Sequence, residues 1–215
     1  PSIDRMAAKG MKFTPHYSGS TVCAPTRCCL MNGVHTGHSY VRGNREVQPE
    51  GQSPIPADLV TIPKLLQKSG YTTGMFGKWG LGAPGSTGDP VNQGWDEFYG
   101  YNCQRQAHTY YPKHLWHNDK KIPMDGQTYS HDLIHEQSLK FIRDNAKRPF
   151  FAYLPITIPH AAMQCPEEDV APFRKKFSQF EDKIGKYSHG TRVRNPVASF
   201  AGMMTRMDRR VGEVL

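Results

Sequence analysis

Four helices are expected along the chain, two from apolar residues at helical spacing and two from start and stop signals. The clearest are residues 130–145 and 197–215, where an apolar side chain returns every three or four positions. Ser2 can cap a short helix over residues 3–9, and Ser130 can cap the helix that follows it. A fourth helix is expected over residues 62–69, with Pro63 near its start and Gly70 as its stop.

Three further segments have the pattern of strands. Residues 11–14 and 71–76 are short runs of strand-forming side chains, and residues 150–154 form a nearly continuous apolar run. A run of the last kind is typical of a strand that is buried on both faces. Helices that lead directly into buried strands predict an α/β fold with a mixed sheet flanked by helices.

Two long segments show neither the helical spacing of apolar residues nor the pattern of a strand. Residues 33–56 are rich in glycine and proline and are expected to be surface loop with no regular core element. Residues 77–128 are read as a long loop, whose many aromatic side chains favour an ordered structure. Long ordered loops in compact domains are usually functional, so this segment is the expected substrate-facing region.

Composition restricts the class of protein. With 21% charged and 37% hydrophobic residues, the 215-residue chain is globular and long enough for one sizeable core or part of a larger one. No apolar run is long enough for a membrane span, and no secretory signal opens the chain. The net charge of +8 is spread over short runs on expected helix faces, which argues against nucleic acid as a partner. Five cysteines without C-x-x-C spacing indicate neither a zinc site nor a disulfide framework.

The stretch from Thr21 to Gly33 holds the first candidate chemistry. Proline is favoured at the first helical position, so Pro25 leaves Cys23 at a junction between loop and helix. Arg27 follows one turn later and can reach the same small volume, where an anion would also meet the free N–H groups of the helix start. The alternative is a buried structural cysteine beside a chance proline and arginine.

Two more basic residues follow expected strands. Lys78 comes directly after the strand over residues 71–76, and His160 comes shortly after the strand over residues 150–154. Each could alone be an ordinary loop residue, but ligands of open α/β sheets bind beyond the carboxyl ends of the strands. Together with Arg27 and Cys23 they suggest a pocket for a tetrahedral oxyanion, whose developing charge fixed cations stabilise.

These residues carry a resemblance to the type I sulfatases, the arylsulfatase-like members of the alkaline-phosphatase-like superfamily. Cys23-Ala24-Pro25-Thr26-Arg27 is similar to their C-x-P-x-R motif, and residues 70–79 resemble their second signature, which ends in Gly-Lys-Trp. Residues 1–7 and 149–160 also resemble segments of that family, in the same order along the chain.

The resemblance implies a mechanism and a set of roles. In this family a formylglycine-generating enzyme oxidises the motif cysteine to formylglycine. Its gem-diol attacks sulfur with the help of a divalent cation, usually Ca²⁺, with Mg²⁺ as the alternative. Cys23 would then be the nucleophile precursor and a metal ligand, and Arg27 would steady the gem-diol. Lys78 and His160 would contact the sulfate group. A sulfated small molecule or sulfated glycan would be the substrate, and the location would be periplasmic or secreted.

The chain also departs from the family pattern. Many relatives have a histidine where Gly80 stands, and His108 could supply an imidazole from the long loop instead. The family's Asp-Asp and Asp-Asn metal ligands, and its second lysine, have no counterpart in these residues. We therefore expect residues 1–215 to be a partial catalytic domain, incomplete at both ends and inactive alone.

Two other functions fit the same residues. A phosphonate monoester or phosphodiester hydrolase of the same superfamily can share the C-x-P-x-R motif. A non-catalytic protein could use the basic pocket to bind sulfated glycans, and it would need no modification of Cys23.

Overall fold

A computed structural model describes residues 1–215, which form two compact units. The larger unit comprises residues 17–107 and 111–156, and it contains the main sheet. The smaller unit comprises residues 1–16, 108–110 and 157–215, and it is mostly helical.

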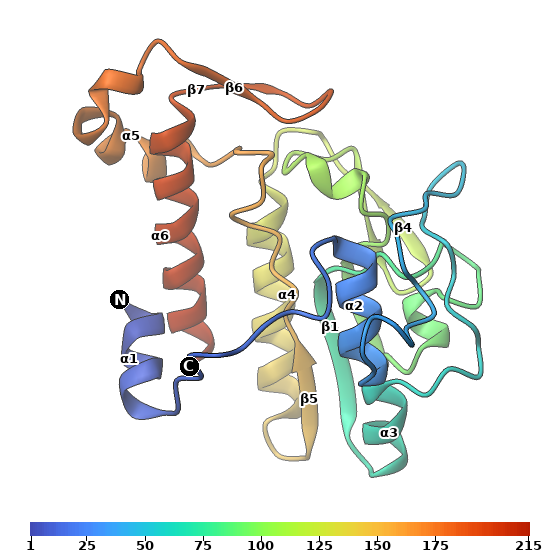
Figure 1. The fold of residues 1–215 in the computed structure, drawn as a ribbon. Helices are drawn as coiled ribbons and strands as arrows, with labels where there is room; N and C mark the ends of the chain where they lie inside the picture. Colours follow the sequence, from blue (N-terminus) through green and yellow to red (C-terminus); the bar gives the residue numbers. More distant parts are fainter. The chain divides into compact units, whose positions relative to one another are not determined.

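The larger unit is built on a five-stranded sheet in the order β4-β3-β2-β1-β5 (Figure 1). The central strand β1 runs parallel to both β2 and β5, whereas β3 is antiparallel to β2 and β4. The sheet is therefore mixed, as predicted. Its strands are β1 (Thr72–Lys78), β2 (Glu97–Tyr101), β3 (His114–His117), β4 (Lys120–Pro123) and β5 (Phe150–Tyr153).

Consecutive residues of β1 enter different cores, because side chains alternate across a strand. Met75 lies in an apolar cluster with Ala24, Cys28 and Met31 of α2 (Cys23–Asn32). Phe76 lies in a second cluster with residues of α4 (Ser130–Asn145), and its ring centroid is 5.3 Å from that of Phe141. The sheet is thus covered by helices, which confirms the α/β fold. The unit also contains α3 (Ile62–Lys68) and the short 3₁₀ helix η1 (Pro90–Asn92), and η2 (Gln106–His108) begins in it.

In the smaller unit, charged side chains join the helices. The carboxylate of Asp208 accepts hydrogen bonds from the N–H groups of Ser2 and Ile3, at 2.7 and 2.8 Å, which places an anion at the start of α1. Asp169 forms a buried ion pair with Arg206 and a partly buried one with Arg209. The helices of this unit are α1 (Ser2–Lys9), α5 (Glu167–Lys176), the 3₁₀ helix η3 (Ser178–Phe180) and α6 (Pro196–Val214).

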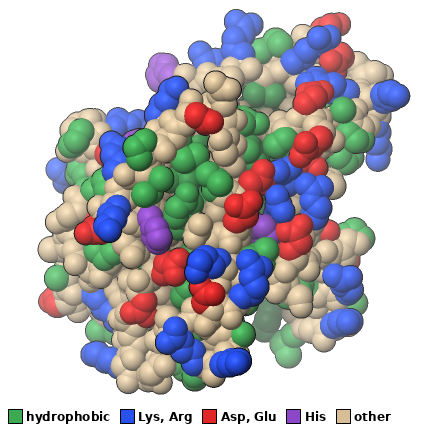
Figure 2. Space-filling view, turned by 180° about the vertical axis from the view of Figure 1, so that it is seen from behind, with side chains coloured by type: hydrophobic (Ala, Val, Ile, Leu, Met, Phe, Trp, Pro, Cys, Tyr) green, Lys and Arg blue, Asp and Glu red, His purple; other side chains and the backbone are tan.

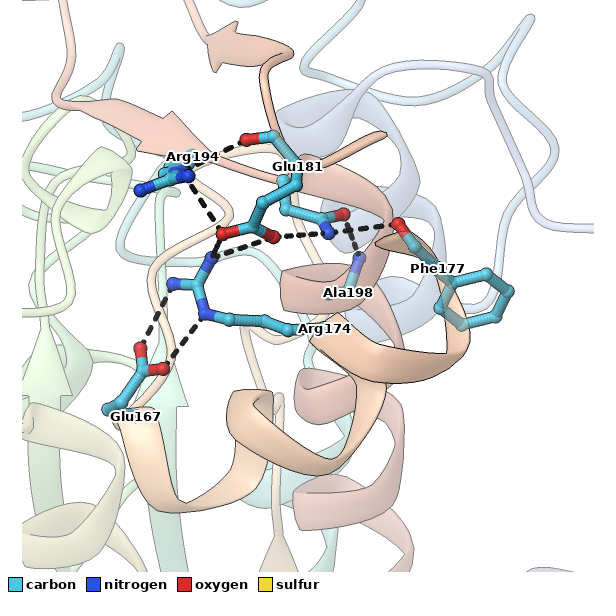
Figure 3. A network of polar contacts seen from close by, with 7 residues as sticks. Glu167, Arg174, Phe177, Glu181, Arg194 and Ala198 are labelled. Atoms are coloured by element: carbon cyan, nitrogen blue, oxygen red, sulfur yellow. Dashed lines mark hydrogen bonds and ion pairs between the residues drawn. The ribbon is translucent and has the colours of Figure 1, made fainter. Parts of the chain in front are cut away.

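A polar network secures the hairpin of β6 (Ile184–Lys186) and β7 (Arg192–Arg194) to the helices around it (Figure 3). The guanidinium of Arg174 binds both oxygens of Glu167 and also contacts Glu181. Glu181 in turn accepts a hydrogen bond from Asn195, whose own oxygen caps the N–H of Ala198 at 3.0 Å. The network therefore ties η3 and α5 to the start of α6.

Several expectations about local structure were wrong. Residues 11–14 form no strand, and the side chains of Ser2 and Ser130 do not cap their helices, because each helix begins at the serine itself. The hydroxyl of Ser130 lies instead 2.6 Å from that of Tyr101.

The two long segments also differ from their predictions. Residues 33–56 contain no helix or strand, as predicted, but they are not purely surface, since Val41 and Ile55 are buried in the core. Residues 77–128 are not one loop, because they contain β2, β3 and β4. Strand β5 is only half-buried, since it lies at the edge of the five-stranded sheet.

None of the helices combines the length and the apolar character of a membrane-spanning segment. In Figure 2, Lys and Arg side chains lie interspersed with Asp and Glu over the face shown. All five cysteines are free thiols.

Candidate active site

The larger unit brings Cys23 and Lys78 together. Cys23 is the first residue of α2, and Lys78 is the last residue of β1, with its Nζ atom 3.7 Å from the Sγ atom of Cys23. Gly77 allows the close approach of strands here. It has φ of +141°, and a Cβ atom at this position would lie 2.4 Å from the carbonyl oxygen of Pro155.

Arg27 joins this pair from the next turn of α2. One terminal nitrogen of its guanidinium donates to the backbone carbonyl of Lys78. Its Nε atom is buried and has no hydrogen-bond partner. The side chain therefore retains donor capacity next to Cys23 and Lys78, the two residues that the sequence assigned to the same pocket.

Burial destabilises the charged form of both cations. Lys78 is only 1% exposed, and burial, with a smaller effect from the charge of Arg27, lowers its pKa to about 8. Cys23 opposes this shift through its charge and its hydrogen bond to the amine. Burial likewise lowers the pKa of Arg27. Neither cation forms an ion pair with a carboxylate, so a bound anion would relieve both.

The start of α2 contributes less than the sequence suggested. Pro25 is the third residue of the helix instead of the first, and it has no N–H group. The N–H of Ala24 is already bound by the side-chain oxygen of Asn44 at 2.9 Å, and that of Thr26 by the carbonyl of Val22. Lys78 and Arg27, more than the helix terminus, therefore make this position attractive to an anion.

The two candidate histidines lie together in the smaller unit. The rings of His108 and His160 are stacked, with centroids 5.1 Å apart and planes inclined by 8°. Tyr187, in the turn between β6 and β7, meets both rings edge-on at 5.0 and 5.1 Å. Tyr110 donates a hydrogen bond to the carbonyl of His160 at 3.0 Å. The five candidate residues thus form two groups, one in each unit.

Sequence reasoning missed Asn44, Tyr187 and a pair of buried amides, Asn102 and Gln104. Asn44 lies in the segment that was expected to be surface loop, and Tyr187 lies far from every motif. Asn102 and Gln104 follow β2 directly, and this strand was not predicted. The rule that ligands bind beyond strand ends would have singled them out if the strand had been recognised.

No cation site is present among these residues. The chain has no group of three or more His, Cys, Asp or Glu side chains that could hold a metal ion. The surroundings of Cys23 are cationic, which is the opposite of what a divalent cation requires of its ligands. The 215 residues by themselves therefore do not fit the expected calcium ion.

Comparison with known proteins gives a consistent result. The family model named Sulfatase matches residues 1–215. The chain is 33% identical to an arylsulfatase of Hemicentrotus pulcherrimus over 75% of its length, and 29% identical to the N-acetylgalactosamine-6-sulfatase of Rattus norvegicus over 86%. It covers only 33% and 40% of those two proteins.

The solved structures agree with the fold. A crystal structure of Ps i-CgsB in complex with k-i-k-neocarrahexaose superposes with a TM-score of 0.80 at 25% identity. The match covers the whole of this chain and 48% of that one.

Proposed function

This chain belongs to the Sulfatase family, and on that premise we propose that the full-length protein that carries it hydrolyses sulfate esters. One observation supports the proposal most directly. Two cations, the buried Lys78 and the half-buried Arg27, converge on Cys23 with no carboxylate to neutralise them. A dianionic or monoanionic tetrahedral group is the ligand that such an arrangement favours.

In this proposal Cys23 is the precursor of formylglycine, and its Sγ atom marks where the aldehyde oxygen would lie. A hydrated aldehyde at this position supplies a nucleophilic oxygen and a second hydroxyl through which sulfate is released. Lys78 and Arg27 bind the sulfate oxygens and hold them against position 23. Binding of the anion raises the pKa of Lys78 from about 8, so its amine stays protonated at neutral pH.

For His108 and His160 we keep the role that the family resemblance implies, which is to supply an imidazole to the sulfate or the leaving group. Their parallel stacking keeps the two imidazoles in a common orientation, and Tyr187 supports both. Imidazole is the side chain best suited to donate a proton to a leaving group near neutral pH.

In this proposal a calcium ion would be bound by residues of the full-length protein other than 1–215. Because residues 1–215 offer no cation site, we assign no step to a metal here. We expect the isolated chain, even when it is modified at Cys23, to bind no calcium in isothermal titration calorimetry and to be inactive.

Sulfated sugars are the proposed substrate class. The names of two matched proteins support this, since one is an N-acetylgalactosamine-6-sulfatase and another was solved with k-i-k-neocarrahexaose. A periplasmic or secreted location belongs to the same proposal, together with modification by a formylglycine-generating enzyme.

The test uses the full-length protein coexpressed with that enzyme. Hydrolysis of an aryl sulfate in the presence of calcium is measured for the wild type, Cys23→Ala and Cys165→Ala. Cys165 is also a partly exposed free cysteine, and it serves as the matched control. We expect Cys23→Ala to abolish activity, Cys165→Ala to retain it, and the intact mass to show exchange of SH₂ for oxygen only where Cys23 is present.

Activity that survives Cys23→Ala unchanged would refute the assignment of the nucleophile. Faster hydrolysis of a phosphonate monoester or phosphodiester than of the sulfate would instead favour the related hydrolase. Binding of sulfated glycans without any mass change at Cys23 would favour a non-catalytic protein.

A further inference from the structure

Beside Lys78, directly beyond the ends of β1 and β2, lie two buried amide side chains. Asn102 is 0% exposed and Gln104 is 4% exposed. Parallel pairing continues past the strand ends here, since the N–H of Gly80 donates to the carbonyl of Asn102 at 3.0 Å. The amides therefore lie at the edge of the sheet where α/β proteins bind their ligands.

Most of the hydrogen-bonding capacity of these amides is unused within the chain. Neither Nδ2 nor Oδ1 of Asn102 has a partner, and Oε1 of Gln104 has none either. Burying such groups without partners destabilises the folded state, so native proteins seldom tolerate it without a function.

The position of Gln104 is strongly constrained. Its backbone N–H donates to the side-chain oxygen of Gln52 at 2.8 Å, and its Nε2 atom donates to the carbonyl of Gly80 at 3.3 Å. A Cβ atom on Gly80 would lie 2.5 Å from Cγ of Gln104. The side chain of Gln104 thus fills the space beside Gly80, with its Oε1 atom left to accept a hydrogen bond.

The unused groups define the chemistry of a ligand. The pair offers the donor Nδ2 of Asn102 and two acceptors, Oδ1 of Asn102 and Oε1 of Gln104. A sulfate group only accepts hydrogen bonds, so it would leave both acceptors without partners. A hydroxyl group both donates and accepts, and it can therefore pair with both kinds of atom.

We propose that Asn102 and Gln104 bind a hydroxyl group of the sugar that carries the sulfate, and so select sulfated sugars over other sulfate esters. This inference rests on the proposed function, because it assumes that the sulfate lies at Lys78 and Arg27. The two residues would determine specificity, and the sulfate-binding cations would not depend on them.

The test uses the variants Asn102→Leu and Gln104→Met in the full-length, modified protein, since these side chains keep the approximate volume and lose the amide. The control is Asn92→Leu, at an exposed asparagine in η1. The kcat/KM is measured on the best substrate in a panel of monosulfated hexoses and N-acetylhexosamines. Inorganic sulfate, which has no hydroxyl group on a sugar ring, is measured as a competitive inhibitor of the same reaction.

We expect Asn102→Leu to lower kcat/KM on the sugar sulfate by about 10- to 100-fold and to change the inhibition constant of inorganic sulfate by less than about twofold. Gln104→Met should act in the same direction with a smaller effect, and Asn92→Leu should change neither constant. The melting temperature of Asn102→Leu should stay the same or rise, because unpaired buried polar atoms have been removed.

An equal loss on both ligands, or a lower melting temperature with no selective loss, would overturn the inference and indicate a structural role. If no sugar sulfate is hydrolysed at all, the proposed function fails, and calorimetric dissociation constants for the same sugars and for inorganic sulfate then decide the inference separately. Weaker binding of the sugars alone would support it, and unchanged binding would refute it.

Discussion

The buried charge of Lys78 should lower the free energy of unfolding of the protein, and replacing Lys78 by methionine should raise it. Its amine is almost completely buried, and its pKa falls from 10.5 to about 8. That difference corresponds to about 3 kcal/mol of free energy lost by keeping the amine charged in the folded state. We predict that Lys78→Met raises the free energy of unfolding at pH 7 by up to about 3 kcal/mol, since methionine can fill the volume of the lysine stem, while it abolishes sulfate ester hydrolysis.

The pH dependence provides a sharper signature. Because the pKa is lower in the folded state, the unfolded chain binds more protons between pH 8 and 10.5, and the stability contributed by Lys78 therefore rises with pH over this window. The difference between Lys78→Met and the wild type should be largest below pH 8 and should shrink towards zero above pH 10.5.

Urea unfolding of the full-length protein, expressed without the modifying enzyme and kept in a chelator, measures both effects. Lys68→Met, at an exposed position of α3, is the control and should change the free energy of unfolding by less than about 0.5 kcal/mol. Inorganic sulfate at 100 times its dissociation constant should stabilise the wild type by about 2.7 kcal/mol and should not stabilise Lys78→Met. A Lys78→Met protein that is less stable at pH 7, with a difference that does not vary with pH, would refute the reasoning.

Three further predictions concern stability. Gly80→Ala should lower the free energy of unfolding by about 1–3 kcal/mol in urea titrations, because φ at Gly80 is +80° and the new Cβ would clash with Gln104. Adding Gln104→Ala removes the clash and should recover only part of the loss. Full recovery would show that the backbone at this position is unstrained. Arg206→Met should cost about 3 kcal/mol by the same measurement, because it removes the buried partner of Asp169; an unchanged midpoint would contradict this. The hydrogen bond from Asn195, aided by Arg174, lowers the pKa of Glu181. The stability that Glu181 contributes is therefore present above pH 4.5 and is lost as the pH falls further. Glu181→Gln should show a shallower dependence of unfolding on acid in a pH titration followed by circular dichroism.

The elements that follow from local pattern were predicted well. The helices at residues 2–9, 62–68, 130–145 and 196–214 and the strands β1 and β5 follow from apolar spacing, from runs of strand-forming side chains, or from the proline and glycine at their ends. Strands β2, β3 and β4 were missed because they are short and because their aromatic side chains were read as a loop. Each is stabilised by pairing with a neighbouring strand, which no local pattern records.

The chemistry of the candidate residues follows from their types and their spacing. The spacing of Cys23 and Arg27 places them on consecutive turns of one helix, since 3.6 residues make a turn, and the resemblance of two motifs identified the family. The surroundings of these residues became known only from the packed fold. It showed that Lys78 is buried against Cys23, that Asn44 occupies an N–H group expected to bind an anion, and that Asn102 and Gln104 lie beside Gly80. Burial and hydrogen-bond partners depend on residues that are 20 to 55 positions apart in the chain, so they are properties of the packed sheet and not of any stretch of sequence.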